Sequence, residues 1–176
     1  MVDGWAGTGN PPPGFLEEKD GMMATEFDLQ NLLAASGDRE NPGPTEMAEL
    51  MSSIRTIAVV GVSRNPEKPA RRVPAYLAAK GYEIVPVNPF VEEIFGKRAF
   101  DSLDEVTDPV DMVLVFRPSA EAAVLAGEAM ERSERPAIWL QQGIWAEDVA
   151  VRARKLGITF VQDLCAYEVH KALASE

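Results

Sequence analysis

From residue 56 onward, short apolar runs alternate with helical segments, and this alternation limits the chain to few folds. The runs are the length of strands, and the segments between them carry apolar residues at a 3.6-residue period. The pattern predicts strands over residues 57–60, 83–87, 110–116, 137–140 and 159–162, and helices over 73–80, 121–132, 147–156 and 167–173.

Strands that alternate with helices form βαβ units, whose right-handed crossovers produce a parallel sheet covered on both sides. We therefore predict an α/β fold over residues 54–176. It is a doubly wound, mostly parallel five-stranded Rossmann-like sheet with helices on both faces. Ligands of such sheets bind beyond the carboxyl ends of the strands, so those ends are the places to search for a site.

The sequence before this domain has a different composition. Residues 1–24 are rich in Gly and Pro, and we predict a disordered tail because such a segment buries little apolar surface. Residues 25–36 and 45–53 predict an N-terminal helical extension, with Thr25 and Thr45 as helix N-caps. The extension, residues 25–53, is either an arm for a protein partner or a second copy, or a non-specific tail.

Composition excludes several classes of function. A net charge of −11 over 176 residues argues against a nucleic-acid partner. No apolar run is long enough to span a membrane, and the first residues lack a secretory signal, so we expect no membrane partner and a cytoplasmic location. One cysteine and one histidine argue against a Cys- or His-based metal site.

The loop after the first expected strand differs from a dinucleotide fingerprint. Ser63 and Pro66 stand where that fingerprint has its second and third glycines, which disfavours an NAD or FAD site. Basic residues nevertheless gather between residues 61 and 72, beside a helix N-terminus that attracts anions. We predict a phosphate-binding loop here, although a solvated helix face is the alternative; the bases are Arg64, Lys68, Arg71 and Arg72.

Three further strand ends supply apolar, amide and cationic groups. Together these groups would suit an adenine ring, a phosphorylated ribose and a long amide-bearing arm. Core packing is the alternative for any single aromatic among them. The three ends read Asn88-Pro89, Phe116-Arg117-Pro118 and Gln141-Gln142-Gly143.

Residues 56–170 resemble the small stand-alone CoA-binding proteins, relatives of the CoA-binding domain of the succinyl-CoA synthetase α-subunit. The resemblance rests on IAVVGVSRNPEKPARRV, GYEIVPVNP, VDMVLVFRPS, IWLQQGIWAEDVAVRARKLGITFV and DLCAYEVH, in that order. It implies phosphate contacts from Gly61, Ser63, Arg64, Lys68 and Arg72. It implies a nucleotide pocket of Val87, Asn88, Pro89, Phe116, Arg117 and Pro118, and contacts to the pantetheine arm from Gln141 and Gly143.

No constellation of residues predicts catalysis. His170 has no partner set that the sequence places, and Cys165 is either a buried apolar group or a thiol that pairs with a bound CoA. We expect non-catalytic binding of coenzyme A or an acyl-CoA, as a sensor or carrier. The alternatives are an NADP-type oxidoreductase or redox sensor, and a protein-interaction module that uses the N-terminal arm.

Overall fold

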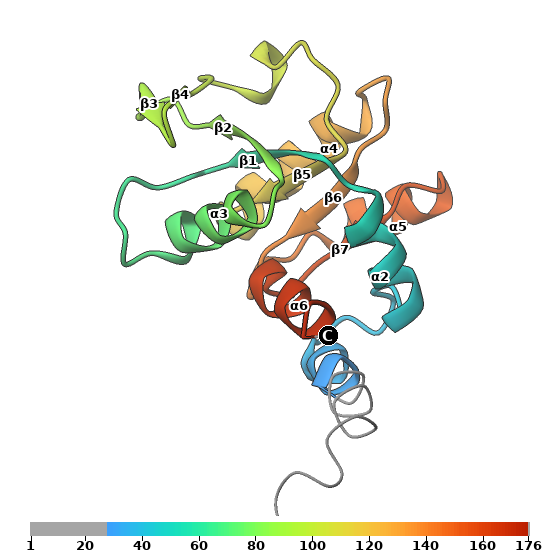
Figure 1. The fold of residues 1–176 in the computed structure, drawn as a ribbon. Coiled ribbons are helices and arrows are strands. Elements are labelled where there is room, and N and C mark those ends of the chain that lie inside the picture. The colour runs from blue at the N-terminus through green and yellow to red at the C-terminus, as the bar shows by residue number, and fades with distance from the viewer. Residues whose placement is uncertain (1–27, 176) are drawn as a thin grey trace, which may run out of the picture.

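Five parallel strands form one sheet in the computed structural model, which describes residues 28–175 (Figure 1). The strand order is β2-β1-β5-β6-β7, so β2 lies on one side of β1 and the later strands lie on the other. This reversal beside β1 is the switch point of a doubly wound sheet. The bounds are β1 Thr56–Val60, β2 Glu83–Val87, β5 Met112–Val115, β6 Ala137–Leu140 and β7 Phe160–Val161.

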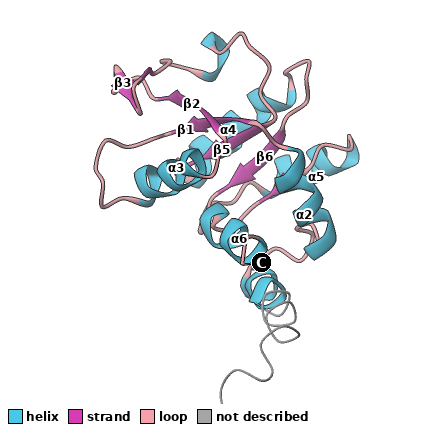
Figure 2. Cartoon of the chain, viewed as in Figure 1, coloured by secondary structure: helices cyan, strands magenta, loops and turns pink. Residues whose placement is uncertain are grey.

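Helices cover both faces of the sheet, as predicted (Figures 1 and 2). Successive residues of a strand point to opposite faces. Ile57 and Val59 accordingly pack with α2, α3 and α6, whereas Ala58 and Val60 pack with α4 and α5. The helices are α2 Pro44–Ser53, α3 Pro69–Ala79, α4 Ser119–Met130, α5 Glu147–Lys155 and α6 Ala166–Leu173.

Several local features differ from the sequence prediction. The N-cap of α2 is Gly43 and Thr45 lies inside that helix, while the other predicted N-cap, Thr25, lies outside the described residues. Helix α3, the helix after β1, begins at Pro69 instead of residue 73, because proline is well suited to the first helical position. Between β2 and β5 the chain also forms a small hairpin and a 3₁₀ turn, which the sequence did not predict. The two strands of the hairpin have two residues each, too few to show a hydrophobic period. These elements are β3 Glu93–Ile94, β4 Lys97–Arg98 and the turn Leu103–Glu105.

The described part of the N-terminal extension packs against the sheet. Residues 28–35 are helical, and Leu29, Met47 and Met51 are buried in the same cluster as α3 and α6. The Asp38 carboxylate accepts hydrogen bonds from Arg154 (2.6 Å) and Gln162 (3.0 Å), and its side chain is 5% exposed. The extension therefore covers the β7 side of the fold, while the predicted disordered tail, residues 1–24, lies outside the described residues. The role of the extension in partner binding stays a prediction. No described helix is long and apolar enough to cross a membrane.

Candidate functional site

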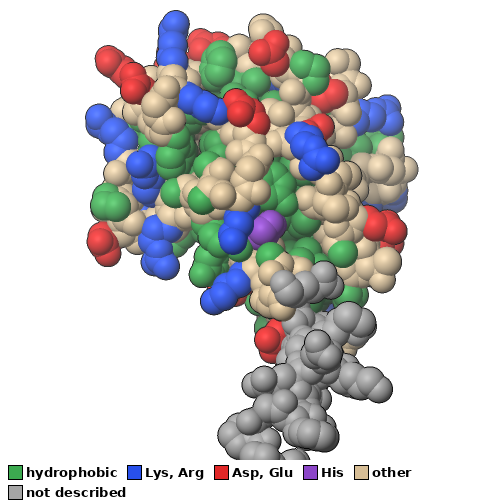
Figure 3. All heavy atoms as spheres, in the orientation of Figure 1, with side chains coloured by type: hydrophobic (Ala, Val, Ile, Leu, Met, Phe, Trp, Pro, Cys, Tyr) green, Lys and Arg blue, Asp and Glu red, His purple; other side chains and the backbone are tan. Residues whose placement is uncertain are grey.

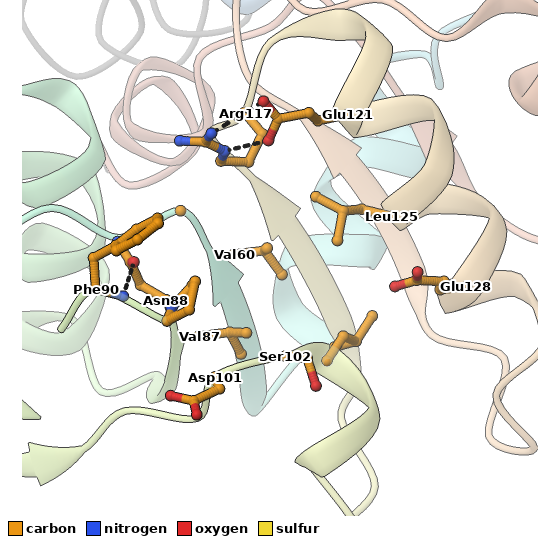
Figure 4. A pocket seen from close by; sticks show the side chains of 13 residues that line it. Val60, Val87, Asn88, Phe90, Asp101, Ser102, Arg117, Glu121, Leu125 and Glu128 are labelled. Carbon is orange, nitrogen blue, oxygen red and sulfur yellow. Dashed lines mark hydrogen bonds and ion pairs between the residues drawn. The ribbon is translucent and has the colours of Figure 1, made fainter. Parts of the chain in front are cut away.

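A cavity of about 280 Å³ opens at the carboxyl ends of β1 and β2, opposite α4. Figure 4 shows Asn88 and Phe90 on one side of this first cavity, Leu125 and Glu128 on the other, and Arg117 near its rim. Of the residues predicted from sequence, it brings together Gly61, Val87, Asn88, Pro89 and Arg117. Its other lining residues are Val60, Phe90, Asp101, Ser102, Leu103, Glu121, Leu125 and Glu128.

Gly61 allows the ends of β1 and β5 to approach each other closely. Its φ is +88°, and a Cβ at this position would lie 2.8 Å from Cδ of Arg117 and 2.9 Å from the Phe116 carbonyl oxygen. Glycine adopts positive φ without steric cost and leaves room for the arginine. The start of the loop after β1 and the residues after β5 are thus direct neighbours.

Arg117 is held at the rim by a bidentate ion pair with Glu121. The guanidinium donates from Nε at 2.8 Å and from Nη2 at 3.1 Å. The hydrogen bond from Arg117 lowers the pKa of the Glu121 carboxyl. The pair fixes the arginine beside the cavity while it offsets part of its charge.

Asn88 ties the loop after β1 to the end of β2. Its side-chain Nδ2 donates to the Val62 carbonyl at 2.7 Å, and its Oδ1 accepts the Phe90 N–H at 2.8 Å. The second bond fixes the backbone of Phe90, whose side chain is 83% exposed at the cavity. The exposed ring offers a flat apolar face at the cavity, where a planar ligand group can contact it.

The loop after β1, residues 61–68, is named the basic turn here. Arg64 and Lys68 are exposed on it, and Arg72 is exposed on the first turns of α3. Figure 3 shows basic side chains gathered on this side of the molecule. No hydrogen bond among the described residues uses the backbone N–H of Arg64, and because Arg64 is exposed this group remains available to an anion.

The helix N-terminus contributes less than the sequence led us to expect. Pro69 occupies its first position and has no N–H. The N–H groups of Arg71 and Arg72 both donate to the Lys68 carbonyl. The Ser63 hydroxyl accepts the Asn65 N–H at 3.1 Å. In the first turn of the helix only the Ala70 N–H has no partner among the described residues, so the other anion donors belong to the basic turn and to the side chains.

A second cavity, of about 510 Å³, lies between α3 and α6. Gln141 is 6% exposed, and its Oε1 accepts the Ala166 N–H at 3.2 Å. Among the described residues its Nε2 has no hydrogen-bond partner, so the amide offers a donor to this cavity. The lining residues are Pro69, Arg72, Val73, Gln141, Gln142, Cys165, Tyr167 and Glu168.

Three predicted site residues lie outside both cavities and the basic turn. Phe116 is half-buried and packs with the cluster under α3, and Pro118 precedes α4. Gly143 donates its N–H to the Asp163 carboxylate at 2.7 Å. Conversely, Phe90 and the acidic residues of the first cavity were not predicted from the sequence. A large aromatic directly after Asn88-Pro89 was the available signal for Phe90.

His170 lies apart from both cavities, between α6 and α3. Its Nδ1 is 3.0 Å from the Tyr76 hydroxyl oxygen, and the rings of Tyr76 and Tyr82 meet it edge to face. Burial and the nearby charge of Lys80 lower the pKa of His170. Within residues 28–175, no group of three His, Cys, Asp or Glu side chains is arranged to hold a metal ion.

Comparison with known sequences places this arrangement among related proteins. The model of a family described as the CoA binding domain matches residues 55–171. An uncharacterized protein, YneT of Bacillus subtilis, is 37% identical over 131 residues, which cover 74% of this chain and 96% of that protein. An ADP-forming acetate–CoA ligase II of Archaeoglobus fulgidus is 26% identical over 95 residues, which are 53% of this chain and only 14% of the ligase.

Solved structures have the same fold. A Thermus thermophilus protein has a TM-score of 0.69 and 37% sequence identity, and the match covers 75% of this chain and 99% of that one. A hypothetical protein from Pyrococcus horikoshii has a TM-score of 0.70 and 26% identity, with coverage of 75% and 92%. Nearly the whole of these small proteins thus corresponds to the sheet and helices described above.

Proposed function

This chain belongs to the CoA-binding domain family, and from that membership we propose that it binds coenzyme A or an acyl-CoA without transforming it, as a sensor or carrier. One observation carries the proposal: the connection from β1 to α3 begins with Gly61 in the first cavity and reaches Pro69 in the second. CoA has a matching layout, because its phosphates separate an adenosine end from a thiol-tipped arm.

The adenine ring fits the first cavity better than a phosphate does. Val60 and Val87 give an apolar surface, and Phe90 offers a ring for stacking. Asp101 and Glu128 also line this cavity; their carboxylates would repel a phosphate and can accept hydrogen bonds from an amino group. We therefore assign the base, and not a phosphate, to this cavity.

The phosphates are assigned to the basic turn. Arg64 and Lys68 are exposed there, and Arg72 is exposed close by on α3. The Arg64 N–H has no partner among the described residues. Charge-assisted hydrogen bonds to phosphate are shorter and stronger than neutral ones. Gly61 and Ser63 shape the turn through its backbone, and only the side chains distinguish one phosphate pattern from another.

The pantetheine arm is assigned to the second cavity. The Nε2 group of Gln141 offers a donor there, and the arm carries amide carbonyls that accept such bonds. Cys165 lines the same cavity. Gly143 lies in the same turn, and its N–H is already bonded to Asp163, so it contributes through its backbone position.

The site favours binding over hydride transfer. His170, the histidine of the chain, lines neither cavity. An NADP site needs cationic groups near the end of β2 for the 2′-phosphate. Here the end of β2 faces Asp101, and the nearby Arg117 is paired with Glu121.

Thermal unfolding with a panel of ligands tests the proposal. CoA should raise the unfolding temperature most, since a ligand stabilises by RT ln(1 + [L]/Kd). Dephospho-CoA, NADP and ATP at the same concentration should raise it less. Native mass spectrometry of freshly purified protein should show a co-purified CoA species. A larger shift with NADP than with CoA would overturn the assignment.

A charge substitution with a matched control separates a direct contact with the phosphates from the effect of the protein's overall charge. Lys68→Gln in the basic turn should weaken CoA binding, and the difference between CoA and dephospho-CoA should shrink if Lys68 contacts the 3′-phosphate. Lys155→Gln removes an equal charge from an exposed position at the end of α5 and should leave both affinities unchanged. Equal losses in the two variants would remove Lys68 from the site.

A further inference from the structure

Pro74 occupies an unfavourable place in α3. It is the sixth residue of a helix that begins at Pro69, beyond the first turn that tolerates proline. A proline there has no N–H to donate to the carbonyl four residues earlier, and its ring pushes against that carbonyl. The carbonyl concerned is that of Ala70.

The Ala70 carbonyl accepts a hydrogen bond from a donor outside the helix. It accepts the backbone N–H of Ser63, in the middle of the basic turn, at 3.1 Å. Pro74 is buried and lines neither cavity, so it is not placed to touch a ligand directly. Its effect on the site must pass through the Ala70 carbonyl.

We propose that Pro74 is a positioning residue for the basic turn: by leaving the Ala70 carbonyl without its helical donor, it makes that carbonyl the anchor for the Ser63 N–H. The proposal rests on the proposed function, because the turn is the phosphate site. It explains why a helix-disrupting residue is compatible with α3 at this position.

The anchor acts on the neighbouring N–H donor of the turn. The turn is held at its other end by the Gly61 N–H, bonded to the Val87 carbonyl at 2.9 Å, and by the Asn88 amide on the Val62 carbonyl. With the Ser63 N–H fixed toward α3, the backbone that carries the adjacent Arg64 N–H is held as well. This N–H is exposed and has no partner among the described residues. Fixing donors before the ligand arrives lowers the entropy cost of binding.

Pro74→Ala tests the role. An alanine restores the N–H and the helical bond to Ala70. That bond draws the Ala70 carbonyl toward the helix axis and away from the Ser63 N–H, so the anchoring bond to Ser63 weakens. The affinity for CoA should fall about fivefold, the effect of one hydrogen bond of ordinary strength. The unfolding temperature without ligand should stay the same or rise, because alanine is favoured in helix interiors. Affinity for adenosine, which has no phosphate, should not change.

Ala79→Gly is the matched control. It weakens α3 at an exposed position near its end, far along the helix from Ala70. It should lower the unfolding temperature and leave CoA affinity unchanged. If Pro74→Ala instead lowers the unfolding temperature and weakens CoA and adenosine equally, the residue is merely structural and the proposal is wrong. Unchanged CoA affinity in a stable Pro74→Ala protein also overturns it.

Amide hydrogen exchange gives a readout that does not depend on CoA. The Ser63 N–H should be protected from exchange in the ligand-free wild-type protein and should exchange faster in Pro74→Ala. Rapid exchange of this group in the wild-type protein would overturn the proposal even if the variant fails to fold. If the wild-type protein does not bind CoA, the proposed function is wrong. The role of Pro74 in holding the Ser63 N–H is then decided by the hydrogen-exchange result alone.

Discussion

Asn41 pairs with both backbone groups of Gln162, donating from Nδ2 to its carbonyl at 2.8 Å and accepting its N–H on Oδ1 at 3.0 Å. Gln162 directly follows β7, the last strand at this edge of the sheet. One side-chain amide therefore imitates the neighbouring strand that the edge lacks. Exposed edges with unpaired backbone groups invite association with other chains, and this contact covers one.

Asn41→Ala should destabilise the fold. It leaves two partly buried backbone groups of Gln162 without partners, and each costs about 1–3 kcal/mol when water does not replace the bond. Urea denaturation measures the loss of unfolding free energy. Asn31→Ala, at an exposed position in the preceding helix, should change it by no more than about 0.5 kcal/mol. Similar values for the two variants would contradict the role given to Asn41.

Comparing Gly61→Ala with Gly81→Ala separates the cost of a positive φ from the cost of a steric clash. Both glycines have positive φ, +88° and +98°, and alanine there costs about 1–2 kcal/mol. A Cβ at Gly81 meets no atom within 4 Å, whereas one at Gly61 collides with Arg117 and the Phe116 carbonyl. Gly61→Ala should therefore destabilise more than Gly81→Ala in denaturation experiments, and only Gly61→Ala should weaken CoA binding. Equal effects would show that the close approach at Gly61 is unimportant.

Phe90→Ala should affect binding and not folding. The ring is 83% exposed, so its removal changes little of the buried surface. If it stacks on adenine, CoA affinity measured by calorimetry should fall by about 1–3 kcal/mol. Val124→Ala, a truncation at another exposed apolar residue, should change neither property. Unchanged affinity in Phe90→Ala would place the base elsewhere.

Acid should weaken the packing of α6 on α3 through His170. Burial and the charge of Lys80 lower its pKa, so the folded protein binds this proton less readily than the unfolded chain does. The stability contribution is thus fully present above the unfolded value, about pH 6.5, and is lost as the pH falls toward the lower folded value. The groups facing the imidazole are the hydroxyl of Tyr76, the ring of Tyr82 and the ammonium group of Lys80.

A titration of the imidazole by NMR gives the folded pKa directly. His170→Gln should flatten the dependence of unfolding free energy on pH between about pH 5 and pH 7. An imidazole pKa at or above the value in the unfolded chain would contradict this prediction. CoA affinity should be unaffected by the substitution, since the ring lines neither cavity.

The alternation of apolar runs was enough to predict the class of fold. Runs such as Met112–Val115 are buried on both faces, which is typical of a parallel sheet between helices. The hairpin at Glu93–Ile94 and Lys97–Arg98 was not predicted, because a strand of two residues cannot show a hydrophobic period. The contact of Asp38 with Gln162 spans 124 residues, and no local pattern encodes it.

The site was predictable where it depends on strand ends and not where it depends on loops. Gly61, Asn88 and Arg117 meet because parallel strands end at one edge, and their positions followed from the strands. Asp101 and Glu128 reach the same cavity from the segment after the hairpin and from α4, and nothing in the sequence relates them. The anchor from Ser63 to Ala70 also depends on an exception to helix rules at Pro74.

The connection that begins at Gly61 and reaches Pro69 joins two separate hollows and has consequences for inhibition. A compound that occupies one hollow and extends onto the shared bridge would compete with the natural ligand without copying its other half. Fragments found independently for each hollow could then be linked across the bridge, where the length of the linker would decide how much affinity is gained.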